Sequence, residues 1–303
     1  MQQPTIRQLE YFVASAECGT LSAAAVRCSA SQAAVSNALS ELERSLGMQL
    51  FVRQTAKGVR LTGSGERALR IARRVLREAL DLQLLAEGEA NEVAGPLRVA
   101  CTSALSSRML PRLATMFREK FPLIELDMVD GLAVEMQRTV LLGEADACLL
   151  YRRQLQPDFD AISLRTIEPY VALAANHPLA GRESIALAEL VDERLIRVDV
   201  KGSFGVMDQL LREANVIPRT GWSFSNPETV RAMVGRGLGY TVLSGKPVST
   251  ESFDGGLVAY LPISDVVLPN EVVLATPRRQ QLTARVRALR DLLLSSEMLS
   301  ALG

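Results

Sequence analysis

The sequence predicts a multi-domain α/β protein with a small helical unit at its start, a long connecting helix, and two α/β lobes. Three observations support this prediction. The first 62 residues contain three short helical patterns followed by a strand hairpin, residues 64–88 carry one continuous helical pattern, and later residues alternate short strand runs with helices. A chain of 303 residues also exceeds the usual size of one compact domain.

The first 62 residues predict a helix-turn-helix. Apolar residues recur at helical spacing from the start of the chain, and Gly19 ends this first helix. A second short helix runs from Leu21 to Cys28. A third begins after Ser31, a favourable N-cap residue, and ends at Gly47. The second and third helices, joined by a brief turn, match the helix-turn-helix pattern.

The outward face of the third helix has the composition of a helix that reads bases. Its residues are Gln32, Ala33, Ser36 and Asn37. Small and hydrogen-bonding side chains can enter the major groove, which is about 12 Å wide, and contact base edges. The alternative interpretation of this segment is an ordinary three-helix bundle with a solvated polar face.

A two-stranded wing follows the third helix. Residues 51–53 and 59–62 alternate apolar residues with polar or basic ones on the two sides of residues 54–58, which hold a turn at Lys57 and Gly58. Residues 51–77 hold eight basic residues and one acid, Glu66. Cations beside a reading helix suit contact with phosphates and the minor groove, so this segment favours the DNA-binding interpretation.

The helix over residues 64–88 predicts a dimer. Its apolar stripe is too broad to remain in water, and no part of the wing is large enough to cover it. Pairing with the same helix of a second chain is the economical solution. The alternative is packing against the C-terminal region of the same chain.

A composition break at residues 92–96 marks a linker to the α/β part of the chain. The expected strands cover residues 97–101, 124–129, 145–150, 170–174, 195–198, 237–243 and 271–275. The expected helices include 136–142, 206–215, 227–235 and 280–294. The pattern restarts after residue 165, which predicts two doubly wound lobes, and a cleft between two such lobes suits a small molecule.

Several other classes of protein are disfavoured. No stretch approaches the roughly 20 apolar residues of a membrane helix, and the first residues lack the layout of a secretory signal, so we expect a cytoplasmic protein. The single histidine, His177, and four cysteines without CxxC spacing imply no metal site, no catalytic triad and no cofactor. An enzyme or a solute-binding protein therefore remains a less favoured hypothesis.

Two cysteines support a separate hypothesis. Cys101 ends the first expected strand of the first lobe and Cys148 lies in the third, and these strands are neighbours in a doubly wound sheet. A thiol-based redox switch between them is conceivable. The alternative is that both are small buried core residues.

The combined motifs resemble the LysR-type transcriptional regulators over essentially the whole chain. The resemblance is carried by residues 19–69, which include LSELERSLG, and by later landmarks in register. These landmarks are LPRLATMFREKFP at 110–122, GEADACLL at 143–150, HPLA at 177–180 and MVGRGLGYTVL at 233–243. The resemblance implies a homodimer or homotetramer that binds double-stranded promoter DNA. It also implies a two-lobed, periplasmic-binding-protein-like (type II) domain that takes a small effector, which we expect to be anionic or polar.

The resemblance also implies domain boundaries. The winged helix-turn-helix covers 1–62, the dimerising linker helix and hinge 63–94, and the effector-binding domain 95–303. Within that domain, lobe 1 comprises 95–165 and 268–303, and lobe 2 comprises 166–267.

Site residues follow from the same resemblance, position by position. Base readout falls on Gln32, Ala33, Ser36 and Asn37, and phosphate or wing contacts on Ser31, Arg53, Lys57 and Arg60. Ala33 and Asn37 depart from the commoner proline and from arginine or histidine. These departures blur which bases are read, because asparagine favours adenine and arginine favours guanine.

Effector contacts are implied at Thr102, Ser103, Gly131, Ser203, Phe204 and Asn226. Hydroxyls and backbone N–H groups at a helix N-terminus can hold an anion, although Thr102 and Ser103 could instead serve as helix caps. We expect Gly131 to sit at the rim of the cleft, where a side chain would block a ligand. Leu132 and Ala133 stand where the family often has a hydroxyl, which indicates a less polar pocket.

The formal net charge of zero conceals an uneven distribution. Residues 1–77 carry a net charge of +6, residues 78–94 carry −5, and residues 95–303 carry −1. The basic surplus therefore lies on the wing and the start of the linker helix, as a DNA-facing end requires.

Overall fold

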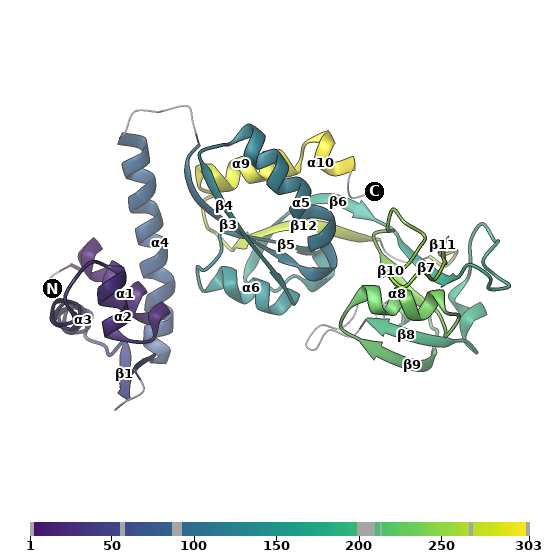
Figure 1. Cartoon of the computed structure of the whole chain (residues 1–303), viewed down its shortest axis with the longest axis horizontal. Helices are drawn as coiled ribbons and strands as arrows, with labels where there is room; N and C mark the ends of the chain where they lie inside the picture. Colours follow the sequence, from purple (N-terminus) through teal and green to yellow (C-terminus); the bar gives the residue numbers. More distant parts are fainter. Residues whose placement is uncertain are drawn as a thin grey trace.

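The computed structural model describes residues 3–54, 58–86, 93–198, 210–212, 214–266 and 269–300. It shows an N-terminal helical unit, a central α/β lobe and a second α/β lobe arranged in a row (Figure 1). Among the described residues, no helix combines the length and apolar character needed to cross a membrane.

The N-terminal unit confirms the predicted winged helix-turn-helix. Its elements are α1 (Ile6–Cys18), α2 (Leu21–Arg27), α3 (Gln32–Leu46), β1 (Phe51–Gln54) and β2 (Gly58–Leu61). The side chains of Thr5, Thr20 and Ser31 each accept a backbone hydrogen bond at the start of their helix. Gly19 and Gly47 end α1 and α3 with positive φ, where glycine carries no steric penalty.

The wing is attached firmly to the helices. The N–H of Val59 in β2 donates to the carbonyl of Gly19 over 2.8 Å. The carboxylate of Glu43, near the end of α3, accepts from the N–H groups of Leu50 and Phe51 at 2.7 and 3.2 Å. These bonds set the angle between α3 and the hairpin.

The long helix α4 (Gly63–Ala86) lies across the helical unit. Leu69 and Ala72 are buried in the same core as Phe12 of α1. Part of the apolar stripe is therefore covered by α1, which the sequence did not indicate as a cover. Ile71 and Leu82 remain 56% and 69% exposed on other sides of the helix.

Lobe 1 is built on a five-stranded sheet in the order β4-β3-β5-β12-β6. Its strands are β3 (Gly95–Thr102), β4 (Ile124–Gly131), β5 (Ala147–Tyr151), β6 (Phe159–Ile167) and β12 (Asn270–Pro277). The first three are parallel to one another, and β12 runs antiparallel to both of its neighbours. Strand β3 already begins at Gly95, so the expected linker at 92–96 is shorter than predicted.

Helices cover both faces of this sheet. One face packs against α5 (Ser103–Lys120), α9 (Ala284–Leu293) and α10 (Ser296–Ser300), and the other packs against α6 (Ala133–Leu141). The helix expected over 280–294 starts only at residue 284, because the Thr283 side chain caps it there and Arg279 has a positive φ of 60°. The C-terminal segments thus return to lobe 1, and β6 stays in its sheet through Ile167, which pairs with Asn270.

Lobe 2 contains two small sheets. The three-stranded sheet has the order β10-β7-β11, and the other pairs β8 with β9. The elements are β7 (Pro169–Ala174), β8 (Arg194–Val198), β9 (Arg219–Phe224), α8 (Pro227–Gly235), β10 (Thr241–Ser244) and β11 (Val258–Pro262), with the 3-10 turn η2 (Leu187–Leu190) between β7 and β8. A second 3-10 turn, η1 (Arg152–Gln154), joins β5 to β6 in lobe 1. The sequence did not predict β6, β9 or β11. Of the helix expected at 206–215, residues 210–212 are helical, 214 and 215 form a turn, and 206–209 and 213 lie outside the described residues.

Candidate DNA interface and effector site

Helix α3 presents the predicted reading residues on its outer face. Gln32, Ala33 and Asn37 are exposed and Ser36 is half-buried, while Val35 on the opposite face is fully buried. The arrangement follows from helical periodicity, because residues three and four apart share a face. The outer face is therefore free to meet a groove.

Two hydroxyl groups form hydrogen bonds at the start of α3, next to the exposed face. The Ser31 hydroxyl accepts from the N–H of Ala34 at 3.1 Å and so caps the helix. The Ser22 hydroxyl, from α2, lies 3.1 Å from Oε1 of Gln32 and orients that amide.

The wing supplies one described cation. Arg60 on β2 is exposed. The backbone of Arg53 pairs with Val59 in the hairpin, but its side chain and the whole of Lys57 lie outside the described residues.

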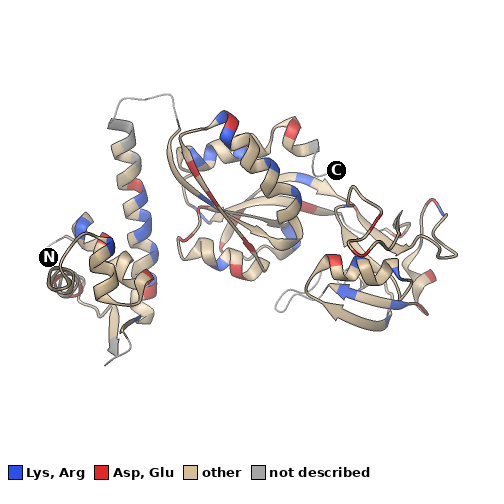
Figure 2. Ribbon diagram, viewed as in Figure 1, with Lys and Arg blue, Asp and Glu red and all other residues tan. Residues whose placement is uncertain are grey.

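The structure corrects the charge argument for α4. Basic segments, all of them arginine, recur along this helix (Figure 2). However, Arg73 and Arg77 form ion pairs with Glu144 and Asp146 of lobe 1, so these two cations are neutralised within the chain. The basic surplus available to DNA is smaller than the sequence alone indicated.

In lobe 1, the structure brings two predicted effector residues together. Thr102 and Gly131 are paired in register at the carboxyl ends of the parallel strands β3 and β4. Helices α5 and α6 start directly after them, and neither helix has a side-chain hydrogen bond at its N-cap. The capping role considered for Thr102 is thus not observed, and this residue is only 4% exposed, with the exposed Ser103 beside it. Unsatisfied N–H groups at helix N-termini favour an anion or another acceptor.

The space beside Gly131 is partly occupied by the chain itself. A Cβ at this position would come within 2.9 Å of the Met136 Cε, so the space beside the glycine is filled by the chain's own methionine rather than left open for a ligand. The same Cβ would lie 3.6 Å from a carboxylate oxygen of Glu135. A negative charge therefore sits close to this edge of the sheet.

In lobe 2, the structure shows a structural role for Asn226. Its side-chain oxygen accepts from the N–H of Glu228 at 2.8 Å and caps α8. Ser203 and Phe204 lie outside the described residues, so their predicted role stays untested.

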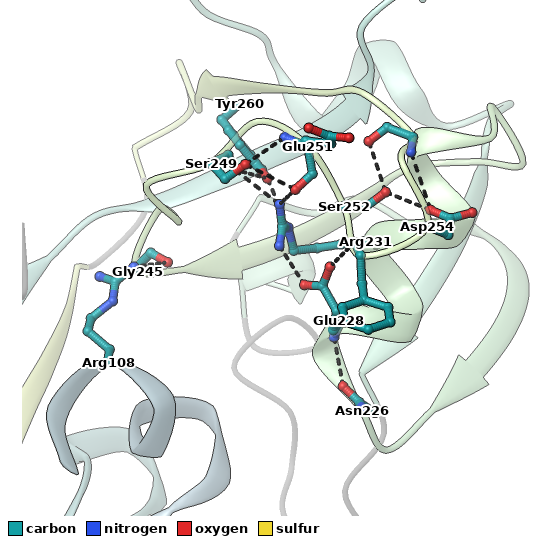
Figure 3. Close-up of polar contacts among 12 residues, drawn as sticks. Arg108, Asn226, Glu228, Arg231, Gly245, Ser249, Glu251, Ser252, Asp254 and Tyr260 are labelled. Carbon is teal, nitrogen blue, oxygen red and sulfur yellow. Dashed lines mark hydrogen bonds and ion pairs between the residues drawn. The ribbon is translucent and has the colours of Figure 1, made fainter. Parts of the chain in front are cut away.

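A direct contact between the lobes was not predicted. Arg108 of α5 donates to the carbonyl of Gly245 at 3.1 Å and also to that of Lys246 (Figure 3). The Tyr151 hydroxyl, at the end of β5, lies 3.5 Å from the carbonyl of Ser244. A Cβ on Gly245 would crowd the Arg108 guanidinium at 3.3 Å. The sequence signal at this contact is weak: Gly-Lys-Pro at 245–247 is typical of a turn but does not indicate a partner in lobe 1.

The loop that receives Arg108 is braced from within lobe 2. Arg231 of α8 donates to the carbonyls of Ser249 and Glu251, each at 3.0 Å, and to the Tyr260 hydroxyl at 2.9 Å (Figure 3). Arg236 pairs with Asp254 farther along the same loop, and this pairing holds the pKa of the exposed Asp254 carboxyl at about 2. Side chains of α8 and its C-terminal end therefore support this loop from within lobe 2.

The structure contradicts the hypothesis of a redox pair between Cys101 and Cys148. Cys148 is in register with Ala100, and side chains alternate along a strand, so the two thiols project to opposite faces of the sheet. They also belong to the cores on the two sides of the sheet. Burial raises the pKa of Cys148 to about 12 and that of Cys101 well above its ordinary value, which suppresses the reactive thiolates.

Family comparisons agree with the domain order seen in the structure. Residues 6–66 match the model of the bacterial regulatory helix-turn-helix protein of the lysR family, and residues 90–297 match the LysR substrate binding domain. The chain belongs to the LysR family of transcriptional regulators.

Individual relatives cover most of the chain. It is 30% identical over 260 residues to the DNA-binding transcriptional dual regulator OxyR of Escherichia coli strain K12, covering 85% of this chain and 84% of the relative. It is also 30% identical over 241 residues to an uncharacterized HTH-type transcriptional regulator, YvbU, of Bacillus subtilis strain 168, covering 79% and 81%.

Solved structures of family members have the same fold. A full-length OxyR variant from Pseudomonas aeruginosa superposes with a TM-score of 0.78 at 27% identity, covering 99% of this chain and 98% of that one. HinK, a LysR family transcriptional regulator from the same species, gives a TM-score of 0.64 at 29% identity, covering 98% and 99%. This LysR-family chain therefore combines a DNA-binding domain with an effector-binding domain.

Proposed function

We propose that this LysR-type regulator reads promoter DNA with Gln32, Ala33, Ser36 and Asn37, supported by phosphate contacts from Ser31, Arg53, Lys57 and Arg60. The observation that carries this proposal is the exposed polar face of α3, held at a set angle to the wing by Glu43. Because its target is promoter DNA, we place its activity in the cytoplasm, as a regulator and not as an enzyme.

Fluorescence anisotropy on DNA from upstream of the chain's own gene tests the DNA-binding proposal. We expect the double variant Gln32→Ala, Asn37→Ala to lose at least tenfold in affinity for the specific site and little for random DNA, because base contacts specify and phosphate contacts position. Gln83→Ala, which removes an exposed amide from α4, is the matched control. Equal losses on specific and random DNA would contradict the assignment of base readout to α3.

We also propose that the protein dimerises through α4, and that tetramers form from such dimers. An apolar groove of about 610 Å³ runs beside α4, lined by residues that include Leu9, Leu46, Met48, Ile71 and Val75. A second copy of α4 is an amphipathic helix whose own apolar face could fill this groove. Light scattering should show monomers for Ile71→Glu and an unchanged oligomer for Arg74→Glu, which adds the same residue at an exposed polar position.

For the effector, we propose a small anionic or polar molecule between the lobes, held by Thr102 and Ser103 and by the start of α6 next to Gly131. Ser203, Phe204 and Asn226 would contribute from lobe 2. The uncapped N-termini of α5 and α6 at one sheet edge support this proposal. An effector changes promoter occupancy only if it binds one arrangement of the protein more tightly than another.

A thermal-shift screen with small mono- and dicarboxylates tests the effector site. A carboxylate that stabilises the wild type should lose most of its effect in Thr102→Val, which keeps the side-chain shape and removes the hydroxyl. Glu135→Gln should strengthen binding of the same anion, because it removes a nearby negative charge. Equal stabilisation of all three proteins would place the binding elsewhere.

A further inference from the structure

Two arginines of α4 join the DNA-binding unit to lobe 1. The side chain of Arg73 is only 9% exposed. It donates to the carbonyl of Leu142 at 2.8 Å, to the Glu144 carboxylate at 3.0 Å, and to the Glu17 carboxylate of α1 at 2.9 Å. A guanidinium is buried this deeply only when its donors are paired, so these contacts define a specific docked arrangement.

One turn farther along α4, Arg77 contacts the same part of lobe 1. It donates to Oδ1 of Asp146 at 3.0 Å and to the carbonyl of Gly143 at 3.3 Å. We call residues 142–146, between α6 and β5, the docking loop. Gly143 has a φ of +67°, and a Cβ there would lie 3.4 Å from both Arg73 and Arg77, so the loop passes close against the helix.

Polar contacts hold this interface more than apolar packing does. A cavity of about 680 Å³ remains between the two surfaces. It is lined by apolar side chains, among them Leu69 and Leu76 of α4, and by Arg98 and Arg138 of lobe 1. Because this cavity keeps part of α4 apart from lobe 1, the paired charges supply contacts there that apolar packing does not.

The docked arginines connect two functional ends of the protein. On one side, Glu17 also pairs with Arg27 of α2 at 2.5 Å, and the end of α1 carries Gly19, which accepts the hydrogen bond from the wing. On the other side, Oδ2 of Asp146 accepts from the N–H of Arg98 in β3 at 2.9 Å. The opposite end of β3 is Thr102, in the proposed effector site.

We infer that Arg73 and Arg77 are positioning residues that clamp lobe 1 to the DNA-binding unit through the docking loop, so that a rigid-body movement of lobe 1 is passed to the helix-turn-helix. The sheet of lobe 1 carries the docking loop at one edge and Thr102 at the other, and a hydrogen-bonded sheet moves as one body. Small displacements at one contact are passed on in this way when the packed units move rigidly. The clamp itself does not depend on the proposed effector, whereas its regulatory use does.

A double-mutant cycle on the full-length protein tests the clamp. The variants are Arg77→Gln, Asp146→Asn and the two combined. The side-chain amide that Asp146→Asn introduces can still accept from the N–H of Arg98 through its oxygen, so the sheet edge is kept while the charge pair is lost. The control is Arg74→Gln, which removes one positive charge from an exposed residue that makes no ion pair in the described part of the chain.

Small-angle X-ray scattering gives the deciding readout, because it reports the arrangement of domains without DNA. We expect both single variants to have a larger maximum dimension than the wild type, the double variant to match the singles, and the control to match the wild type. Non-additivity is the signature of a shared interaction. The inference would be overturned if the wild type and the three clamp variants had the same maximum dimension, or if the effects of the two single substitutions on that dimension were additive.

DNA binding separates this inference from the proposed function. With intact helices by circular dichroism, the clamp variants should bind a single half-site within about threefold of the wild type and protect a footprint of different length on the full promoter. Arg77→Lys should restore the footprint in part, because lysine can pair with Asp146 but cannot also reach Gly143. An unchanged footprint in Arg77→Gln would overturn the regulatory role even if scattering supports the clamp, and absence of DNA binding by the wild type would count against the proposed function alone.

Discussion

The helices of the DNA-binding unit begin differently from the two helices that follow β3 and β4 in lobe 1, whereas α9 of lobe 1 has a threonine cap like the first group. Helices α1, α2 and α3 each begin with a threonine or serine side chain that satisfies a backbone N–H, whereas α5 and α6 begin at the edge of the sheet with no such side-chain cap. In the DNA-binding unit the helix starts are satisfied within the chain, so contact with DNA is left to exposed side chains. The starts of α5 and α6 leave backbone donors open, which is the property a site for a small acceptor molecule requires.

The largest expected effect comes from breaking the self-contained packing of the DNA-binding unit. A Cβ at Gly65 would lie 2.1 Å from the carbonyl oxygen of Leu50, so Gly65→Ala should lower the free energy of unfolding of this unit by roughly 3 kcal/mol. Urea unfolding followed by circular dichroism measures the change. Gly63→Ala lies in the same helical turn with no atom within 4 Å and should be neutral or slightly stabilising. A loss of similar size there would show that the close contact with Leu50 is not the cause of the destabilisation.

A second prediction distinguishes the base contact expected of the Gln32 amide from the phosphate contact expected of the Arg60 cation. Gln32→Ala should cost about 1–3 kcal/mol at one base position and relax specificity there, while Arg60→Ala should weaken binding to all sequences and lower the salt dependence by about one ion. Anisotropy titrations at several salt concentrations on matched and mismatched sites measure both effects. If the two variants gave the same salt slope, the assignment of Arg60 to phosphate contact would be wrong.

The comparison of helix starts can be tested directly on stability. Ser31→Ala removes an observed cap and should cost about 1 kcal/mol, whereas Thr102→Val removes a hydroxyl with no capping bond and should cost clearly less. Thermal unfolding of the full chain without effector provides the measurement. A larger loss for Thr102→Val than for Ser31→Ala would show that the hydroxyl of Thr102 has a structural role.

The smallest expected effect concerns the cysteines, which also differ between the two regions. Cys18 and Cys28 in the DNA-binding unit are partly exposed, whereas Cys101 and Cys148 are buried. A thiol reagent such as Ellman's reagent should therefore label two cysteines in the native protein and four after unfolding. Mild peroxide should leave the DNA affinity of Cys101→Ser, Cys148→Ser equal to that of the wild type, and a peroxide response lost in this variant would restore the redox hypothesis.

The pKa of Cys148 adds a pH dependence to the same comparison. Because burial raises this pKa from 9.0 to about 12, the folded state favours the neutral thiol. Its contribution to stability is complete below pH 9 and declines as the pH rises from 9 toward 12, where the unfolded chain ionises first. The free energy of unfolding of each protein is measured by urea unfolding from pH 7 to pH 11 and expressed relative to its own value at pH 7. On this scale Cys148→Ala should lose less stability above pH 9 than the wild type.

Sequence patterns were most informative where the structure is local. The stops at Gly19 and Gly47, the cap at Ser31 and the wing follow from neighbouring residues, and all were predicted. The strands β6, β9 and β11 were missed because their residues are partly exposed, so the apolar pattern that marks a strand is weak. The candidate effector residues could be named from the family resemblance, but the sequence did not indicate that Met136 lies beside Gly131, because that contact forms only in the folded chain.

By itself, the sequence determined the order of the domains, the exposed face of α3 and the excess of cations in the first 77 residues. All three depend on residues close together in the chain, whose spacing sets which side chains share a helix face. Only the tertiary structure decided that Arg73 and Arg77 face acids of lobe 1, that Cys101 and Cys148 lie on opposite sides of a sheet, and that Arg108 spans the lobes. These contacts join residues many tens of positions apart, and strand register and domain docking, which no local pattern encodes, bring them together.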